Sequence, residues 1–189
     1  MPASVSSWTS AYLGLGANTG RRYEQVGRAL AQLDAQDDIS VRRVSSPYET
    51  EAHRLPGQDP VPSFLNAVAH IRTTLSPEAL LHRTQALESD AGRVQAARWA
   101  PRPLDIDLLV VGASTRATEQ LTLPHPRLAQ RRFVLAPWAE LAPNLWVPDP
   151  FDATVENLYR ACADPHAIRR VDRSLSTYLS LPETPPSRL

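Results

Sequence analysis

The chain has 189 residues, the size of one domain, and 42% of them are hydrophobic, enough for a folded core. Lys plus Arg and Asp plus Glu balance at 20 each, so the composition gives no electrostatic case for nonspecific nucleic-acid binding. The single cysteine, Cys162, excludes an internal disulfide, and no stretch approaches the ~20 apolar residues of a membrane span. We expect a cytoplasmic protein with a loose leader at residues 1–8, a single domain over 1–171 and a mobile tail over 172–189.

The first elements follow from hydrophobic spacing. Ala11–Gly16 has the pattern of a strand that ends in a glycine-rich turn. A helical stripe of apolar residues predicts a helix over Arg21–Leu33. A second strand is predicted over Ile39–Tyr48, and the segment Glu51–Pro62, rich in proline, glycine and charge, is predicted to be a loop.

The third predicted strand, Phe64–Thr73, alternates in a way that separates its two faces. One face carries the residues suited to a core, which are Leu65, Ala67, Ala69 and Ile71. Phe64 and Asn66 lie side by side on the opposite face. An aromatic ring beside an amide can stack on a flat heterocycle and pair with its polar edge, although an aromatic residue in a strand is also typical of a core.

The remaining elements complete the topology. Ser76 caps a helix that runs to about Asp90, followed by a loop over Arg93–Arg102 and a strand over Leu104–Val111. Beyond it we expect irregular structure with a short helix near 134–141 and a last helix over 153–163. The order β-α-β-β-α-β with a C-terminal extension predicts a ferredoxin-like α+β fold.

Asp105 and Asp107 give the strongest chemical signal. In a strand both carboxylates point to one face, where two like charges need a compensating cation. Magnesium prefers oxygen ligands and is typically held by one or two carboxylates plus substrate phosphates. The alternative is an ordinary half-exposed strand, although aspartate is a poor strand former.

Arginines precede this pair, at Arg93, Arg98 and Arg102. Guanidinium groups match phosphate oxygens, so metal carboxylates beside arginines indicate phosphoryl or pyrophosphoryl transfer. His125, between two prolines, is fixed in direction and suits a phosphate contact, with a structural histidine as the alternative. The chain contains no P-loop motif, and Thr19 replaces the third glycine of a dinucleotide fingerprint.

Together these motifs resemble the 6-hydroxymethyl-7,8-dihydropterin pyrophosphokinase family of folate biosynthesis. The matching pieces cover about residues 11–148 in the right order. They are Tyr12–Asn18, Val44–Thr50, Phe64–Val68, Glu88 with Gly92-Arg93, the Arg98–Asp107 segment, and Leu123-Pro-His125 followed by Arg131-Arg-Phe133. The piece Arg-Trp-x-Pro-Arg-x-x-Asp-x-Asp is highly specific to that family, although Ala100 and Pro103 depart from its usual glycine and threonine.

The resemblance implies an ATP-dependent diphosphotransferase, a magnesium enzyme, and a role for each matched residue. Asp105 and Asp107 would bind two magnesium ions that bridge the triphosphate of ATP. Phe64 and Phe133 would sandwich the pterin, while Asn66 and the Thr50 region would recognise its edge. The phosphates would contact four residues, Arg93, Arg102, Arg131 and His125, of which Arg93 and Arg102 would be catalytic together with the two aspartates. Glu88 and Trp99 would help to build the nucleotide site.

Two other classes of function remain open. A noncatalytic ferredoxin-like ligand-binding module would have no use for the Asp105 and Asp107 pair. An RNA-binding module would need a strand with basic and aromatic residues of the RNP type, which the sequence lacks. We therefore expect small molecules as the partners of this chain, namely ATP and a hydroxymethyl dihydropterin, without nucleic acid or membrane, and a monomer.

Overall fold

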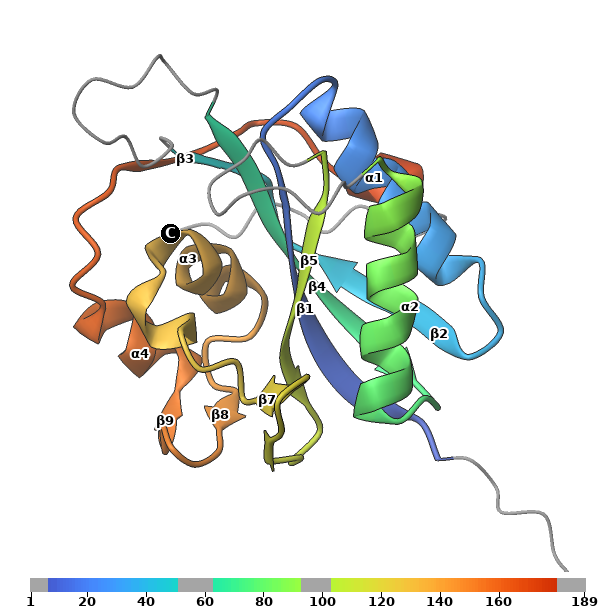
Figure 1. Cartoon of the computed structure of the whole chain (residues 1–189). Coiled ribbons are helices and arrows are strands. Elements are labelled where there is room, and N and C mark those ends of the chain that lie inside the picture. Colours follow the sequence, from blue (N-terminus) through green and yellow to red (C-terminus); the bar gives the residue numbers. More distant parts are fainter. Residues whose placement is uncertain (1–6, 51–62, 93–102, 180–189) are drawn as a thin grey trace, which may run out of the picture.

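A six-stranded antiparallel sheet forms the centre of the computed structural model, which describes residues 7–50, 63–92 and 103–179 (Figure 1). Its strands are β1 (Thr9–Ala17), β2 (Ile39–Val44), β3 (Tyr48–Thr50), β4 (Phe64–Thr73), β5 (Asp105–Val111) and β10 (Ile168–Arg170). β1 lies between β4 and β5, β2 and β3 both pair with β4, and β10 pairs with β3. With α1 (Arg22–Asp34) after β1 and α2 (Pro77–Asp90) after β4, this order confirms the ferredoxin-like prediction.

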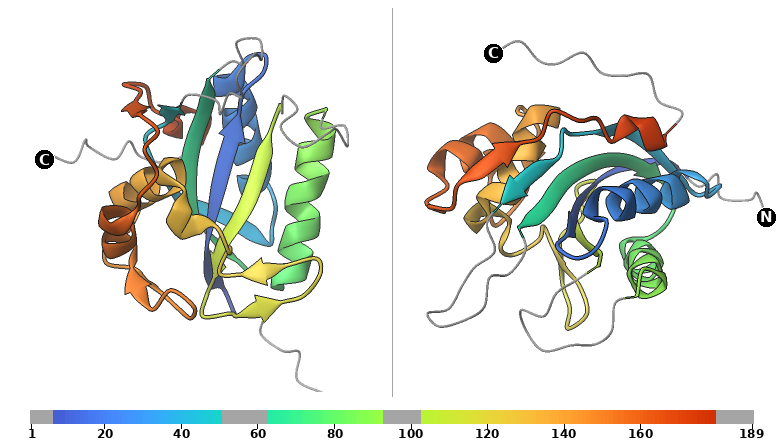
Figure 2. Two further views of the ribbon diagram at one scale, coloured as in Figure 1. Left: turned by 60° about the vertical axis from the view of Figure 1, so that its left-hand side comes forward. Right: turned by 90° about the horizontal axis from the view of Figure 1, so that it is seen from above.

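Helices cover both faces of the sheet, so the protein has three layers (Figure 2). α1 and α2 lie on one face, and the extension after β5 places α3 (Arg132–Leu141) and α4 (Val155–Ala161) on the other. The short elements of the extension are β6 (Arg116–Ala117), β7 (Thr122–Leu123), β8 (Trp146–Val147), β9 (Ala153–Thr154) and the 3-10 turns Leu128–Gln130 and Ser176–Tyr178.

The core beneath α1 and α2 follows from strand alternation. Every second residue of β1 enters it, from Ala11 through Leu13 and Leu15 to Ala17, each at most 2% exposed. The four alternating apolar residues expected on one face of β4 are in the same cluster. α2 begins as its sequence indicates, because the Ser76 hydroxyl accepts a hydrogen bond from the Ala79 amide at 3.2 Å.

A second core lies between the sheet and the helices α3 and α4. Tyr12 of β1 and Val68 of β4 pack there with Leu109 of β5 and the fully buried Trp138 of α3. Cys162 belongs to this cluster as a buried free thiol. On the same face, the polar residues described below begin next to this core, since Val68 pairs with Gly14 and Gly14 pairs with Asp107.

The predicted second strand is divided in the structure. Instead of one strand over 39–48, β2 ends at Val44 and β3 begins at Tyr48. At the break, the Ser45 hydroxyl accepts a hydrogen bond from the Val68 amide at 3.0 Å and so replaces a backbone partner. Pro47 has no amide hydrogen to donate to a ladder, which is why regular pairing resumes only after it.

The segment expected to be a mobile tail from residue 172 is packed as far as the structure describes it. Leu175 is 1% exposed and Leu179 is 9% exposed, and both belong to the core beneath α1 and α2. The expectation missed this contact because proline and polar residues dominate the end of the sequence. The last helix is also shorter than predicted, since Ala153 and Thr154 form β9 and Thr154 caps α4.

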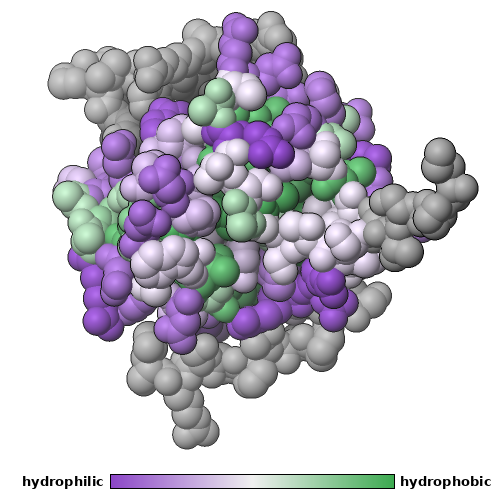
Figure 3. All heavy atoms as spheres, turned by 90° about the horizontal axis from the view of Figure 1, so that it is seen from below, coloured by the Kyte–Doolittle hydropathy of each residue, from purple (hydrophilic) through white to green (hydrophobic). Residues whose placement is uncertain are grey.

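The surface is mixed in character. Figure 3 shows one face, on which hydrophobic residues occur as scattered small areas among hydrophilic ones. In the described ranges, none of the helices combines the length and the apolar composition needed to cross a bilayer.

Candidate active site

The two carboxylates of β5 lie on the sheet face that carries α3. Asp105 and Asp107 alternate with Ile106 and Leu108, which enter the core on the opposite face. Both aspartates are partly exposed, and the side chain of Asp107 is 34% exposed. The fold therefore brings two oxygen-bearing side chains to one surface, as the sequence predicts.

Two glycines of β1 leave room beside these carboxylates. Gly16 pairs with Asp105, and Gly14 pairs with Asp107. A Cβ atom at Gly16 would lie 3.2 Å from the amide oxygen of Asn66, and one at Gly14 would lie 3.5 Å from Leu109. These glycines are not among the site residues predicted from the sequence, although two glycines spaced by two in a strand indicate a place where another group approaches the backbone.

Asp107 is held by two neighbours from the extension. A guanidinium nitrogen of Arg131 lies 2.9 Å from its Oδ2, and Nε2 of His125 lies 3.9 Å from the same oxygen. The Arg131 side chain is only 19% exposed, so this ion pair is partly shielded from water. The structure thus joins three residues that the sequence analysis assigned to one phosphate and metal site.

His125 faces Asp107 in its neutral form. Burial, the largest cause, lowers the pKa of His125 below its ordinary value, and the nearby charge of Asp107 only partly opposes this. Its Nδ1 accepts a hydrogen bond from the Arg127 amide at 3.1 Å, so the ring proton of the neutral form lies on Nε2. His125 therefore directs an N–H donor towards the carboxylates, which suits a phosphate oxygen.

Three of the four residues expected to recognise a heterocycle come together on β3 and β4, and the fourth, Phe133, lies on α3. Asn66 is 6% exposed, and its amide nitrogen donates to the Thr50 hydroxyl at 2.9 Å. Phe64 is half-buried at the start of β4, on the same face as Asn66. Phe133 is half-buried in the first turn of α3, with the Arg131 guanidinium 5.6 Å from its ring centroid.

Glu88 supports the strand that carries the aspartates. Its side chain is buried, and its Oε1 accepts a hydrogen bond from the Ile106 amide at 2.7 Å. Because β5 is an edge strand, this bond satisfies an outward amide between Asp105 and Asp107. The structure therefore places Glu88 behind the carboxylates, where it fixes their strand. Three further predicted site residues, Arg93, Trp99 and Arg102, lie outside the described residues.

The donor set fits magnesium. Nowhere in residues 7–50, 63–92 and 103–179 do three or more acidic, histidine or cysteine side chains gather at metal-binding distance. Asp105 and Asp107 supply two hard oxygen ligands, the number that Mg²⁺ typically takes from a protein when phosphates complete its shell. Arg131 occupies one oxygen of Asp107 in this structure, so an ion binding there would share or displace that contact.

A cavity of about 430 Å³ lies on the other face of the sheet, between the start of α1 and the C-terminal segment. Its lining includes Arg21, Arg22, Glu49 and Arg173. Arg22 is already bound to Glu49 at 3.0 Å, and none of the predicted site residues lines this cavity. The chemistry therefore points to the α3 face and not to this cavity.

Comparisons with known proteins identify the fold and the family. The HPPK-DHPS of Plasmodium falciparum, solved with pterin and p-hydroxybenzoate, superposes on this chain with a TM-score of 0.62 at 14% sequence identity. The match covers 82% of this chain and 42% of that longer chain, and this likeness shows the fold. Two bacterial proteins named 2-amino-4-hydroxy-6-hydroxymethyldihydropteridine pyrophosphokinase match more strongly in sequence.

The protein from *Bacillus subtilis* is 42% identical over 69% of this chain and 77% of its own length. The one from *Methylorubrum extorquens* is 39% identical over 87% of this chain and 99% of its own length. The family model described as 7,8-dihydro-6-hydroxymethylpterin-pyrophosphokinase matches residues 12–143, a range that contains all the site residues named above. The chain belongs to the 7,8-dihydro-6-hydroxymethylpterin-pyrophosphokinase family.

Proposed function

We propose that this chain transfers the β,γ-pyrophosphate of ATP to 6-hydroxymethyl-7,8-dihydropterin, giving the pterin diphosphate and AMP. The observation that carries this proposal is the register of three strands. Gly16 of β1 pairs with Asn66 on one side and with Asp105 on the other. Asn66 and Asp105 are therefore two strand spacings apart, about 10 Å. A heterocycle held at Asn66 could extend its hydroxymethyl group across Gly16 towards phosphates held at the carboxylates.

The pterin end of the site uses an amide and two aromatic rings. Asn66 and Thr50 present hydrogen-bonding groups to the polar edge of the ring, and their mutual bond at 2.9 Å fixes the orientation of both. Phe64 and Phe133 stack on its two faces, because a flat conjugated ring is attracted to aromatic side chains. This division leaves the hydroxymethyl group free to face β5.

The phosphate end uses charge. Asp105 and Asp107 would hold two magnesium ions. His125 and Arg131 would contact phosphate oxygens, together with Arg93 and Arg102 from the segment outside the described residues, and Trp99 of that segment would help to build the nucleotide site. Glu88 contributes by fixing β5. Magnesium supplies neutralisation of the triphosphate charge when bound. In the reaction the hydroxymethyl oxygen bonds to the β-phosphorus while the bond from that phosphorus to the oxygen of the α-phosphate breaks, so AMP leaves.

One product analysis tests the reaction. Protein, ATP, magnesium and 6-hydroxymethyl-7,8-dihydropterin are incubated together, and the nucleotide products are separated. The proposal expects AMP and pterin diphosphate in equal amounts, with none formed when the pterin is omitted. ADP as the product would mean simple phosphoryl transfer and would contradict the proposal.

The assembly is a further part of the proposal. We infer that a monomer performs the reaction, since the three strands that carry Asn66, Gly16 and Asp105 belong to one chain. Light scattering at the protein concentration of the assay tests this, and a dimer that retains full activity would contradict it. We place this monomer in the cytoplasm as a separate proposal.

A further inference from the structure

The C-terminal segment Cys162–Leu179, called the strap below, connects three parts of the molecule. It leaves α4, passes the start of α3, pairs with β3 as β10, and ends against α1 (Figures 1 and 2). The family match ends at residue 143, so the strap lies beyond it.

The first contact is at the start of α3. No side chain of the neighbouring residues caps this helix at Arg131. Instead, Oδ2 of Asp164 accepts a hydrogen bond from the Arg132 amide at 3.0 Å. The amides of a first helical turn have no partner within the helix, and a negative charge there is favourable to the helix dipole. Asp164 thus caps α3 from a distant position in the chain.

The side chain of Arg132 adds two hydrogen bonds between α3 and the strap. Its Nε donates to the Asp164 carbonyl at 3.0 Å, and its terminal nitrogen donates to the Cys162 carbonyl, also at 3.0 Å. Asp164 is itself oriented by His166, whose amide donates to Oδ1 at 3.1 Å. Burial opposes ionisation of Asp164, but hydrogen bonds from His166 and Arg132 outweigh it and lower the pKa of this carboxyl.

The turn that Asp164 caps is the one that faces the site. Arg131 precedes it and binds Asp107 at 2.9 Å, and Phe133 follows in the same turn. Without a cap, the first turn of a helix frays, and its side chains lose their fixed direction. Asp164 thus binds the backbone between Arg131 and Phe133, the two residues of this turn that face the site.

The second contact holds the opposite wall of the site. β10 pairs with β3 in register, so that Ile168 lies opposite Thr50. The pairing continues past β10, where the Val171 amide donates to the Pro47 carbonyl at 2.8 Å. A strand of three residues has few bonds of its own, so β10 adds support to the backbone that carries Thr50.

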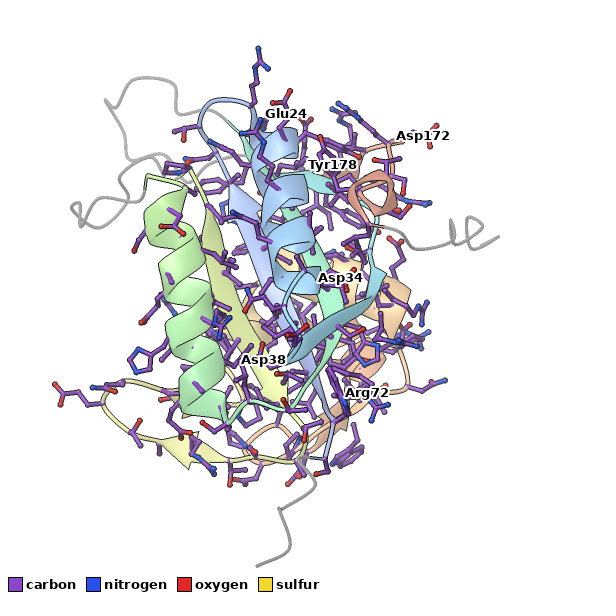
Figure 4. All side chains as sticks on the ribbon, turned by 90° about the vertical axis from the view of Figure 1, so that its right-hand side faces the viewer. Glu24, Asp34, Asp38, Arg72, Asp172 and Tyr178 are labelled. Carbon is purple, nitrogen blue, oxygen red and sulfur yellow. The ribbon has the colours of Figure 1, made fainter. Side chains whose placement is uncertain are left out.

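The third contact anchors the end of the strap. The ring of Tyr178 packs so closely on Gly27 of α1 that a Cβ atom at this position would clash with it, so the missing side chain makes room for the ring. Figure 4 shows Tyr178 against α1 and Asp172 directed away from the body of the protein. Arg173 also stacks on the Tyr23 ring at 3.8 Å. The strap is therefore fixed at both ends of its path.

We propose that Asp164 is a positioning residue for Phe133, which forms one wall of the pterin site. The strap connects this wall to the opposite wall, which Thr50 forms. This inference rests on the proposed function for the identity of the ligand. In this proposal Asp164 does not touch the substrate, because it acts through its hydrogen bond with the Arg132 amide.

Three variants test the proposal: Asp164→Ala, the conservative Asp164→Asn and the matched control Asp172→Ala, an exposed aspartate of the same strap. Amide hydrogen exchange of Arg132–Val134 is measured in the free protein, where it reports on the cap without any ligand. Binding of 6-hydroxymethyl-7,8-dihydropterin is then measured with magnesium and a nonhydrolysable ATP analogue. Denaturant unfolding of each variant identifies general loss of stability.

We expect Asp164→Ala to speed exchange in the first turn of α3 and to weaken pterin binding about threefold to thirtyfold, the range that loss of a helix cap produces. Asp164→Asn keeps an acceptor for the Arg132 amide and should restore both properties, and Asp172→Ala should change neither. If amide exchange in the first turn of α3 were unchanged in Asp164→Ala, the claim that Asp164 caps this helix would be wrong. Faster exchange with unchanged pterin binding would overturn the positioning role. A wild-type protein that binds no pterin would overturn the proposed function itself, a result that the exchange data distinguish from a failed cap.

Discussion

Two parts of one sheet face differ in the size and polarity of their side chains, and the difference occurs in each of the strands β1, β4 and β5. At the end covered by α3 the strands carry large apolar residues, and at the other end they carry small or polar ones. The apolar set is Tyr12, Val68 and Leu109, and the polar set is Gly14, Gly16, Asn66, Asp105 and Asp107. These three strands thus contribute both to a packed core and to a candidate active site, and the two adjoin where Val68 pairs with Gly14.

This difference shows how the site is built without a separate domain. The packed end fixes the positions of the strands, and the loss of side chains at Gly14 and Gly16 leaves space between the amide and the carboxylates. We therefore expect stability and function to depend on different residues of the same strands. Substitutions at the apolar end should change the free energy of unfolding, and substitutions at the polar end should change binding and rate.

The largest effect should come from the carboxylates. Asp105→Ala or Asp107→Ala should lower the rate of transfer by about a thousandfold, because each removes a ligand that neutralises phosphate charge. Initial rates at saturating magnesium measure this, with exposed Glu119→Ala as the control. Near-normal turnover in either aspartate variant would break the assignment of metal to this end of the face.

Trp138 tests the packed end. Its side chain is fully buried, and its indole nitrogen has no hydrogen-bond partner among the described residues, so truncation removes packing and no bond. Trp138→Ala should lower the free energy of unfolding by about 3–5 kcal/mol. Trp146→Ala, at a tryptophan that is 58% exposed, should cost about 0.5 kcal/mol or less. Denaturant unfolding compares them, and equal losses would contradict the described packing.

Phe64 and Phe133 test whether the site binds pterin and ATP through different residues. Phe64→Ala and Phe133→Ala should each weaken pterin binding by about 1–3 kcal/mol, by analogy with stacking of bases on aromatic side chains. ATP affinity should change little in both. Phe151→Ala, at a phenylalanine that packs on the second core, should leave pterin binding unchanged. If Phe64→Ala weakened ATP and pterin equally, collapse of the core would be the better explanation.

The smallest effect should come from the two glycines. Gly16→Ala places a Cβ atom 3.2 Å from the Asn66 amide oxygen, which must move, whereas Gly14→Ala makes an ordinary contact at 3.5 Å with Leu109. We expect Gly16→Ala to weaken pterin binding by about 1 kcal/mol, at the lower limit for overpacking. Titration calorimetry of both variants should show the larger loss for Gly16→Ala, and the reverse order would contradict the proposed place of the pterin.

Much of this arrangement could be predicted from the sequence because it depends on local spacing. Alternation in β4 and the spacing of Asp105 and Asp107 place side chains on a face without knowledge of the fold. The pair of Asn66 with Thr50 joins residues 16 positions apart and requires the register of the sheet. The pair of Arg131 with Asp107 joins residues 24 apart and requires the packing of α3 on the sheet. The motif resemblance supplied the roles of these residues and not their contacts.

The strap was missed for a similar reason. Leu175 and Leu179 are the apolar residues that fix it, but their partner surface includes α1, far away in sequence. The role of Gly27 cannot be recognised without Tyr178 in place, because glycine in a helix is otherwise only unfavourable. Asp164 likewise gives no local signal, since the helix that it caps begins 32 positions earlier.

The most direct test of the account is the position of the metal along β1 and β5. Manganese can replace magnesium at oxygen ligands and broadens the NMR signals of nearby amides. With Mn²⁺, a nonhydrolysable ATP analogue and pterin bound, the amides of Gly14–Ala17 and Asp105–Asp107 should lose their signals first. Those of Thr9–Ala11, about 20 Å further along the strand, should persist. Equal broadening at both ends, or stronger broadening at Thr9–Ala11, would contradict the account.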